Sequence, residues 1–224
     1  IWLNLGDLTM KKQRAFTLAE ISIVLGLIVL TALLVIPNLI EDNKKLDSIS
    51  KWKHSYQNIE YVFSALYAQV TDTDEISFKN AKTTQEKETL LFELLNPYFR
   101  MTDEVASKDY KISYLNGSNV KPEDEFYISN FHKTSAGKII GLKWLNTPQS
   151  LYDNVPLAIL SVDLNGLSKP NKWGYDIFGV NIYRTRIEPV GKSNDEFLMK
   201  SDCSRKGKGL ACSYYYYIYG GQLN

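Results

Sequence analysis

The sequence contains few of the side chains that most enzyme and metal sites use. Its 224 residues include two cysteines and two histidines. Cys203 and Cys212 are too far apart for a redox C-x-x-C motif, and His54 and His132 are distant from them in sequence. Neither a glycine-rich phosphate loop nor a G-x-S-x-G motif is present. We therefore expect a protein that is not an enzyme and that needs no cofactor.

An excess of charge of one sign is also absent. The chain has 26 Lys and Arg residues against 25 Asp and Glu residues, which gives a net charge of +1. No internal repeat is visible, and the only biased tract is a run of tyrosines near the end of the chain. A chain without a dominant field is not expected to be a general nucleic-acid binder.

What the sequence does have is one long apolar run, residues 21–36, directly after the segment KKQRAFTLAE of residues 11–20. As a helix, residues 16–36 would be about 31 Å long, close to the roughly 30 Å of a bilayer core. Glu20 stands at the start of this span, and a carboxylate at the centre of such a helix costs roughly 2.5–3.5 kcal/mol. The carboxylate therefore needs a partner. Cleavage before Phe16 would create one, a free amino group.

This combination of a basic patch, a small residue, a phenylalanine and a single carboxylate resembles the leader of type IV pilins and of the pseudopilins of type II secretion systems. In that family a membrane-embedded prepilin peptidase cuts before the phenylalanine and methylates the new N-terminus. The resemblance implies a leader of residues 1–15, cleavage between Ala15 and Phe16, N-methylation of Phe16, and a role for Glu20 in assembly.

Two departures from the family pattern are visible. The family usually has glycine where this chain has Ala15, a small substitute that should still fit the peptidase. Residues 1–9 are uncharacteristic of a leader, and we expect translation to begin at Met10.

The apolar run has two other interpretations, a cleaved signal peptide and a plain signal anchor, and both fit the sequence less well. Cleavage by ordinary signal peptidase needs small residues after the apolar core, and the run ends Val35-Ile36-Pro37-Asn38, which offers none. A plain signal anchor would need neither Glu20 nor a phenylalanine at the charge boundary.

Pro37 removes a backbone donor and predicts a kink in the helix. Pilin-like proteins carry a proline at this distance from the cut, although the end of any membrane helix would look similar.

Beyond Pro37 the apolar residues follow steps of three and four, which is typical of one face of an amphipathic helix. They are Leu46, Ile49, Trp52, Tyr56, Ile59, Phe63, Leu66 and Val70. The pattern predicts one long helix from about Thr17 to Val70. Its residues 16–36 would lie in the membrane or in a fibre core, and residues 71–224 would form a head domain.

The head has the signals of an α+β fold. A short helix is predicted over residues 85–95, ended by Asn96-Pro97, and turns are predicted at Asn116-Gly117 and Ala136-Gly137. Strands are predicted over residues 138–145, 155–162 and 176–183. Together these elements predict a pilin-like plan, in which a long N-terminal membrane-spanning helix packs on an antiparallel sheet and a cysteine-bearing tail follows.

The loop between Asp163 and Asp176 is the one segment of the head with possible metal chemistry. It resembles the D-x-N-G…P-N-x-x-G-x-D-x-F pattern found in many pilin-like heads, with Phe178 completing it. Oxygens of Asp163, Asn165, Asn171 and Asp176 are ligands that Ca²⁺ prefers. The EF-hand pattern is not met. We favour a structural Asn-Gly turn in which both aspartates cap backbone donors.

The two cysteines are expected to form a structural disulfide. A head outside the inner membrane would lie in an oxidising space, where the pair Cys203 and Cys212 should close. Closing a loop of about ten residues would stabilise the head by roughly 2.5–3 kcal/mol.

Basic residues precede a run of tyrosines in the C-terminal tail. Cations beside aromatic rings could hold single-stranded DNA or a sugar chain. We favour a terminal β-strand, residues 214–219, whose tyrosines alternate between sheet and solvent while the basic residues keep the edge soluble. The basic residues are Lys200, Arg205, Lys206 and Lys208.

From these features we predict a non-enzymatic structural subunit of a type IV pilus-like or type II secretion-like filament. The expected partners are prepilin peptidase, other pilin-like subunits, the inner-membrane assembly platform, and the membrane before assembly, with nucleic acid possible but not favoured. The protein would sit in a bacterial inner membrane with its head outside the cytoplasm, and then in a pilus or periplasmic pseudopilus. The alternatives are an anchored binding module for DNA uptake or adhesion that never polymerises and, in third place, an anchored exported enzyme.

Overall fold

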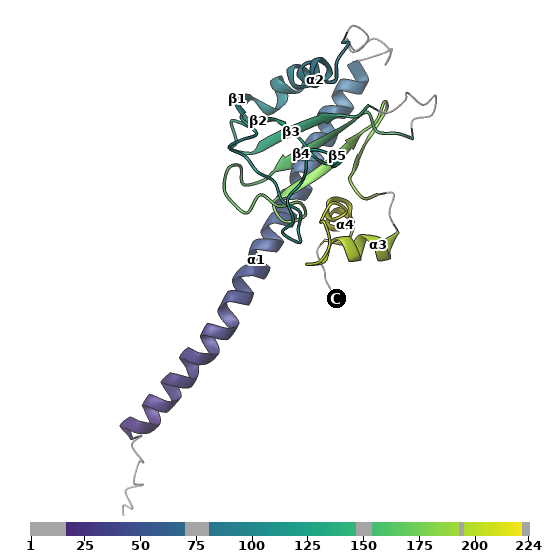
Figure 1. The fold of residues 1–224 in the computed structure, drawn as a ribbon. Coiled ribbons are helices and arrows are strands. Elements are labelled where there is room, and N and C mark those ends of the chain that lie inside the picture. The colour runs from purple at the N-terminus through teal and green to yellow at the C-terminus, as the bar shows by residue number, and fades with distance from the viewer. Residues whose placement is uncertain (1–16, 70–80, 147–153, 193–194, 221–224) are drawn as a thin grey trace, which may run out of the picture. The chain divides into compact units, whose positions relative to one another are not determined.

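The structure is a computed structural model that describes residues 17–69, 81–146, 154–192 and 195–220 (Figure 1). The chain divides into two compact units, Ile1–Lys44 and Lys45–Asn224. Helix α1 (Leu18–Gln69) is 52 residues long and contributes to both units. The predicted helix from about Thr17 to Val70 is therefore confirmed, and it continues through Pro37 without a break.

The part of α1 from Leu18 to Pro37, within the first unit, is strongly apolar. Residues Leu18–Pro37 have a mean hydropathy of 2.7, and none of this stretch is buried inside the structure. By length and composition this is the one helix among the described residues that is apolar enough to cross a membrane.

The part of α1 in the second unit is amphipathic. Its buried residues recur at steps of three and four and form part of the head's core. They are Ile49, Trp52, Tyr56, Ile59, Val62 and Phe63. Leu46 departs from the predicted face, since 53% of its surface is exposed. Val70 lies outside the described residues.

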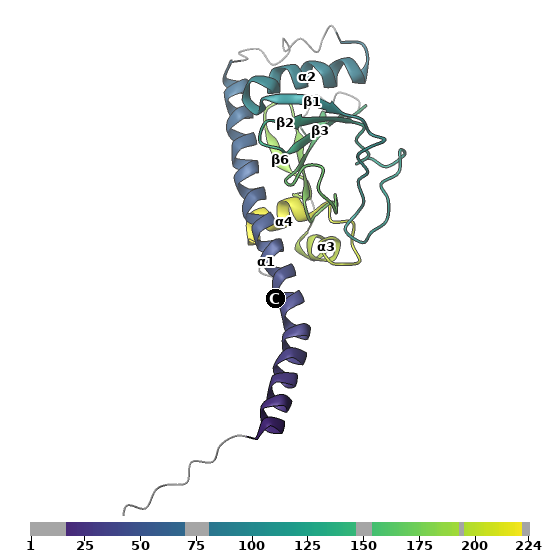
Figure 2. The same cartoon turned by 90° about the vertical axis from the view of Figure 1, so that its left-hand side faces the viewer.

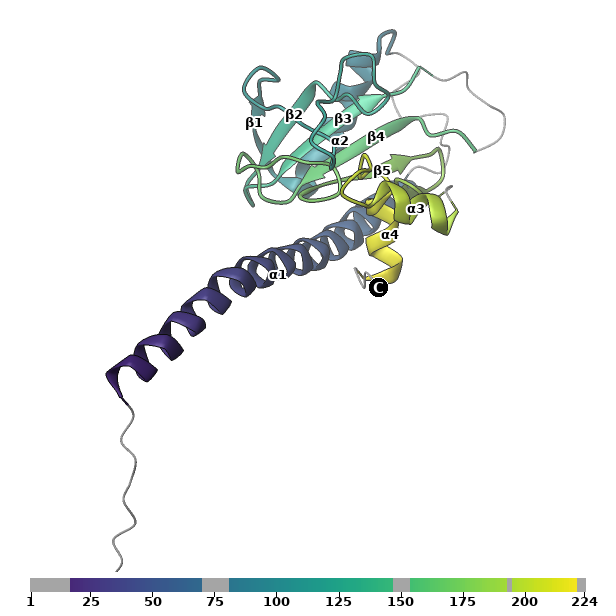
Figure 3. The same ribbon diagram turned by 60° about the horizontal axis from the view of Figure 1, so that its bottom comes forward.

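The head is built on one six-stranded antiparallel sheet whose spatial order is the chain order, β1 to β6. Figures 1 and 3 show β1 to β5 in this order. The strands are β1 (Met101–Val105), β2 (Asn130–Thr134), β3 (Ile139–Trp144), β4 (Ala158–Asp163), β5 (Ile177–Ile182) and β6 (Ile187–Pro189). This confirms the three predicted strands over 138–145, 155–162 and 176–183. Gly137, with a φ of 80°, turns β2 into β3 as predicted.

Both faces of the sheet are covered, which explains why β4 is buried along its whole length. Leu160 and its neighbours on one face pack with α1 and α2 in the larger core, and Figure 2 shows both helices on this side. Ile159 and its neighbours on the other face pack with Tyr110, Tyr114 and Trp173 in a smaller core.

The three strands β1, β2 and β6 were not predicted. β1 is an edge strand that exposes Thr102, Asp103 and Glu104 and half-buries only its two end residues. An edge strand carrying exposed charges lacks the apolar alternation on which strand prediction depends.

Helix α2 (Thr84–Phe99) is longer than the predicted 85–95 and does not end at Asn96-Pro97. Pro97 costs only one backbone hydrogen bond here because it lies in the last turn. The helix ends instead at Arg100, which has a φ of 48° and donates its N–H to the Asn96 carbonyl at 2.8 Å. Its start is a capping box between Thr83 and Glu86.

The C-terminal tail folds as two helices, α3 (Glu196–Asp202) and α4 (Cys212–Tyr219). The predicted terminal strand over residues 214–219 is wrong. An unbroken tyrosine run has no alternation of period two, so packing decides the conformation rather than β-propensity. Tyr215 and Tyr216 are buried, and Gly220 ends the helix in a left-handed conformation.

Candidate functional site

The first turn of α1 is organised around Glu20. The carboxylate Oε2 accepts the Thr17 backbone N–H at 2.8 Å and the Thr17 hydroxyl at 2.9 Å. The Glu20 N–H in turn donates to the Thr17 hydroxyl oxygen at 3.2 Å. This is a capping box, which satisfies two of the free donors at a helix start. The T-x-x-E pattern that signals it was present in the sequence but missed, while the predicted cleavage site, Ala15 and Phe16, lies outside the described residues.

After this cap the surface of the helix as far as Pro37 is mainly apolar. Its side chains from Leu18 to Ile36 include Leu18, which is 86% exposed, and Leu33, which is 69% exposed. The polar side chains bond to their own helix, since the Ser22 hydroxyl donates to the Leu18 carbonyl and the Thr31 hydroxyl to the Leu27 carbonyl. A helix whose polar groups are satisfied internally is suited to hydrocarbon or to the apolar surface of other chains.

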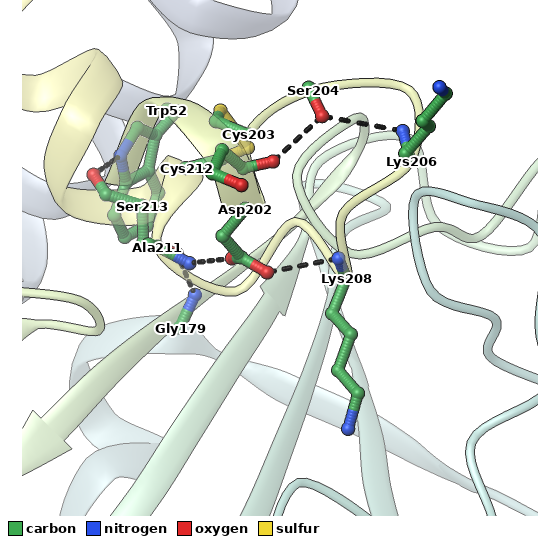
Figure 4. Close-up of a disulfide and its surroundings, with 11 residues drawn as sticks. Trp52, Gly179, Asp202, Cys203, Ser204, Lys206, Lys208, Ala211, Cys212 and Ser213 are labelled. Carbon is green, nitrogen blue, oxygen red and sulfur yellow. Dashed lines mark hydrogen bonds between the residues drawn. A yellow bond between two sulfur atoms is a disulfide. The ribbon is translucent and has the colours of Figure 1, made fainter. Parts of the chain in front are cut away.

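Trp52 joins α1 to the C-terminal tail within the head. Its side chain is fully buried, its ring stacks on Phe178 at 5.0 Å, and its indole N–H donates to the Ser213 carbonyl at 2.8 Å. Figure 4 shows Trp52 beside Ser213 and the disulfide. The Ser213 hydroxyl oxygen also accepts the backbone N–H of Gly179 at 2.9 Å, so that one residue holds both α1 and β5.

A disulfide between Cys203 and Cys212 closes this part of the tail, which confirms the predicted pairing. The two Cα atoms are 5.1 Å apart, and both residues are buried. The bridge connects the end of α3 to the first residue of α4. It therefore fixes the start of the helix that carries Ser213.

Asp202 organises the loop that the disulfide closes, and it was not predicted. Its carboxylate accepts the N–H groups of Lys208 at 2.9 Å and Ala211 at 2.7 Å (Figure 4). Gly207 is required here because a Cβ at this position would lie 1.9 Å from the Asp202 carbonyl oxygen. We call residues 202–213 the C-terminal clasp.

The loop from Asp163 to Asp176 brings the predicted metal candidates together as a hydrogen-bonded turn. Both carboxylates are almost fully buried. Asp163 accepts the Asn165 N–H at 3.0 Å and the hydroxyl of Tyr110. Asp176 accepts the Asn171 N–H at 3.0 Å and the Asn165 side-chain amide at 3.2 Å. The turn with aspartates capping backbone donors is therefore confirmed.

In this arrangement the two carboxylates accept hydrogen bonds, and their burial favours the protonated form. Burial raises the pKa of Asp163 to about 7, although the hydrogen bond from Tyr110 lowers it. Burial also raises the pKa of Asp176. Among the described residues, no group of three or more His, Cys, Asp or Glu side chains could hold a metal ion. Calcium binding stays a disfavoured prediction that a titration can test.

Some of the basic residues and tyrosines of the tail make contacts within the head. Lys208 lies over the ring of Tyr114, with its ammonium 4.9 Å from the ring centre, and Lys200 pairs with Glu196 at 2.9 Å. Tyr215 and Tyr216, as noted, are buried in the head's larger core. The structure therefore uses the middle of the tyrosine run for packing.

Comparisons with known proteins do not extend this description. No protein-family model matches the chain, and neither a curated protein nor a solved structure matches it. The two features that bear on function are the exposed apolar helix with its Thr17–Glu20 cap and the head with its C-terminal clasp.

Proposed function

We propose that this protein is a structural subunit of a type IV pilus-like or type II secretion-like filament, made as a membrane-anchored precursor. The observation that carries the proposal is α1 itself. Its residues Leu18–Pro37 are apolar and uncovered, while its residues from Ile49 to Phe63 are part of the head's core. One helix thus offers an apolar rod to a membrane or to other copies while carrying a folded head.

The α+β head supports the same proposal. A long N-terminal helix followed by an antiparallel sheet is compatible with the pilin plan that the sequence resembles. The disulfide in the tail suits a head exported to an oxidising space.

Glu20 distinguishes a filament subunit from a plain anchor, which would need no carboxylate at the edge of hydrocarbon. In the single chain this carboxylate is held by Thr17. After cleavage before Phe16, the new amine of a neighbouring subunit becomes an alternative partner that carries a full positive charge. Such a pair would offset the several kcal/mol that desolvation costs each ion in an apolar core.

The first test is the mass of the chain after co-expression with a prepilin peptidase. We expect the loss of residues 1–15 and the gain of one methyl group on Phe16. Glu20→Gln and Glu20→Val should be cleaved like the parent, because neither change touches the cut bond. A chain that keeps its leader would contradict the filament proposal.

The second test is the yield of sheared filaments from the same strains. Glu20→Gln keeps an oxygen that can accept a hydrogen bond from Thr17 but removes the negative charge. We expect filament yield to fall about tenfold or more, because a tenfold change corresponds to the loss of about 1.4 kcal/mol from each contact between subunits. Thr31→Val, another polar residue of the same span, is the matched control and should assemble normally. Normal yield from both Glu20 variants would refute the charge pair, and an anchored module that never polymerises would give no filaments from any strain.

A further inference from the structure

The two C-terminal helices expose an apolar face that the core does not explain. Phe197 and Leu198 of α3 are 78% and 51% exposed, and Ile218 and Tyr219 of α4 are 49% and 41% exposed. We call these four residues the C-terminal apolar face. Other exposed apolar side chains of the head include Tyr61, which is 73% exposed, and the α2 pair Leu94 and Tyr98, which are 38% and 39% exposed.

The two helices that carry this face lie next to each other. On α3, the Lys200 ammonium pairs with Glu196 at 2.9 Å. Phe197 lies one helical turn before Lys200 on α3, and the ring of Tyr219 is 5.1 Å from that of Tyr215. Figures 1 and 2 show α3 and α4 side by side. The four residues and Lys200 therefore lie on two neighbouring helices.

This surface lies at the end of the head where the chain arrives from the apolar span. Lys45, the first residue of the head unit, has its ammonium 5.5 Å from the ring centre of Tyr216 in α4. Gly220, which ends α4, adjoins the Lys53 ammonium. Even fully extended, the chain from Pro37 to Lys45 reaches at most roughly 28 Å. A bilayer that held residues 18–37 would therefore be kept close to this end of the head.

The composition of the surface suits the boundary between lipid headgroups and acyl chains. Aromatic and aliphatic side chains beside lysines are typical of interfacial helices, in which the apolar body enters the boundary and the ammonium groups stay with the headgroups. Arg205 and Lys206, on the connection between α3 and α4, are also exposed. They add positive charge that anionic lipid attracts.

We infer that the C-terminal apolar face docks on an anionic lipid surface, that of the membrane in which the protein's own apolar helix is anchored. The inference rests on the membrane anchoring in the proposed function, and it adds a docked state of the head before assembly. We favour a lipid surface over a second copy of the chain. The short segment from Pro37 to Lys45 keeps the bilayer near the face at any protein concentration, whereas binding of a second copy depends on that concentration.

The test uses the full chain, one copy per nanodisc, in phosphatidylcholine and phosphatidylglycerol lipids with or without brominated acyl chains. Phe197→Trp places a fluorescent reporter on the face. Tyr61→Trp is the matched control, because Tyr61 is 73% exposed and lies sixteen residues beyond Lys45, about 24 Å along α1. Both changes exchange one exposed aromatic ring for another, and circular dichroism checks that each variant is folded.

We expect brominated lipid to remove about half of the fluorescence added by Phe197→Trp and none of that added by Tyr61→Trp, since an interfacial side chain reaches roughly 5–10 Å into the boundary. Replacing phosphatidylglycerol by phosphatidylcholine should weaken the quenching. Equal quenching of both reporters, or of neither, would overturn the inference. So would a Phe197→Trp signal that changes only when two copies share a disc, because the face would then bind a second chain. Incorporation into discs is scored separately, so a failure of the anchor is distinguishable from a failure of the face.

Discussion

The first and second parts of α1 differ in what surrounds their apolar side chains. From Leu18 to Pro37 none of the helix is buried by the protein, whereas Trp52 and Ile59 in the second part are almost completely buried in the head. The polar groups differ too. In the first part Ser22 and Thr31 bond to their own helix, while in the second part Lys51 is exposed and pairs with Asp47. One helix is therefore suited to two environments, an apolar one outside the protein and the aqueous surface of its own head.

The sharpest test of this difference compares one large-to-small change in each part. Trp52→Ala removes a fully buried ring and its hydrogen bond to Ser213, so the head should lose about 3–5 kcal/mol of unfolding free energy. Leu27→Ala in the apolar span should change it by less than about 0.5 kcal/mol, because none of the described residues buries this span. Guanidinium unfolding of the detergent-solubilised chain, followed by circular dichroism, measures both. Similar losses from the two variants would show that the span packs on the head.

The second largest effect is expected from the disulfide. Cys203→Ser combined with Cys212→Ser should lower the free energy of unfolding by about 2.5–3 kcal/mol, as for a bridge nine residues apart. Ser213 should then hold Trp52 less firmly, so hydrogen exchange should speed up first in α4. The apolar part of α1 should be unaffected. Mass spectrometry of the unreduced parent should find no free thiol, and two alkylatable thiols in exported protein would contradict the bridge.

A pH-dependent loss of stability is expected from the buried carboxyl of Asp163. Burial raises its pKa to about 7 in the folded head from an ordinary value of 3.8, so the folded state binds the proton more tightly than the unfolded state does. The stabilisation that protonated Asp163 gives the folded head is fully present below pH 3.8. It is lost as pH rises to about 7, by at most about 1.4 kcal/mol per pH unit.

Asp163→Asn removes this titration and should flatten the curve between about pH 4 and 7. Burial lowers the pKa of His132, so its titration makes stability rise with pH, opposite to Asp163. Because His132 is present in both parent and variant, its effect cancels when their pH profiles are compared. Asp176, whose pKa burial also raises, stays in both proteins. Identical pH profiles of unfolding free energy in parent and variant would show that Asp163 does not titrate in this range.

The smallest effect concerns helix α2, which has a capping box like that of α1 but lies on the head. Thr83→Ala removes the side-chain acceptor for the Glu86 N–H and should cost about 1 kcal/mol. Thr83→Ser keeps the acceptor and should cost little. The equivalent change at Thr17 should leave head stability unchanged, because the first part of α1 does not contribute to the head's core. Thermal melts of the three variants make the comparison.

The sequence predicted best the elements whose apolar pattern is continuous. Helix α1 and strands β3 to β5 follow from such patterns, as does the turn at Gly137. β1 could not be predicted in this way, because its exposed side chains carry no apolar alternation. α4 was misassigned because a run of tyrosines has the composition of a strand, and only packing against α1 and β5 favours a helix.

The site was predictable only where its residues are neighbours in sequence. The disulfide and the aspartate turn follow from local spacing and chemistry, and the Thr17–Glu20 cap could have been found from its T-x-x-E pattern. The hydrogen bond from Tyr110 to Asp163 joins residues 53 positions apart, and that from Trp52 to Ser213 joins residues 161 positions apart. No local pattern specifies contacts of this kind, which depend on the assembled sheet.

The most direct test of the central claim is a mass spectrum of fibres sheared from cells that express this chain with a prepilin peptidase and an assembly platform. We expect fibres whose subunit begins at N-methylated Phe16 and contains the closed Cys203–Cys212 bridge. A chain found only in the membrane fraction, with its leader retained and no sheared fibre containing it, would contradict the filament proposal.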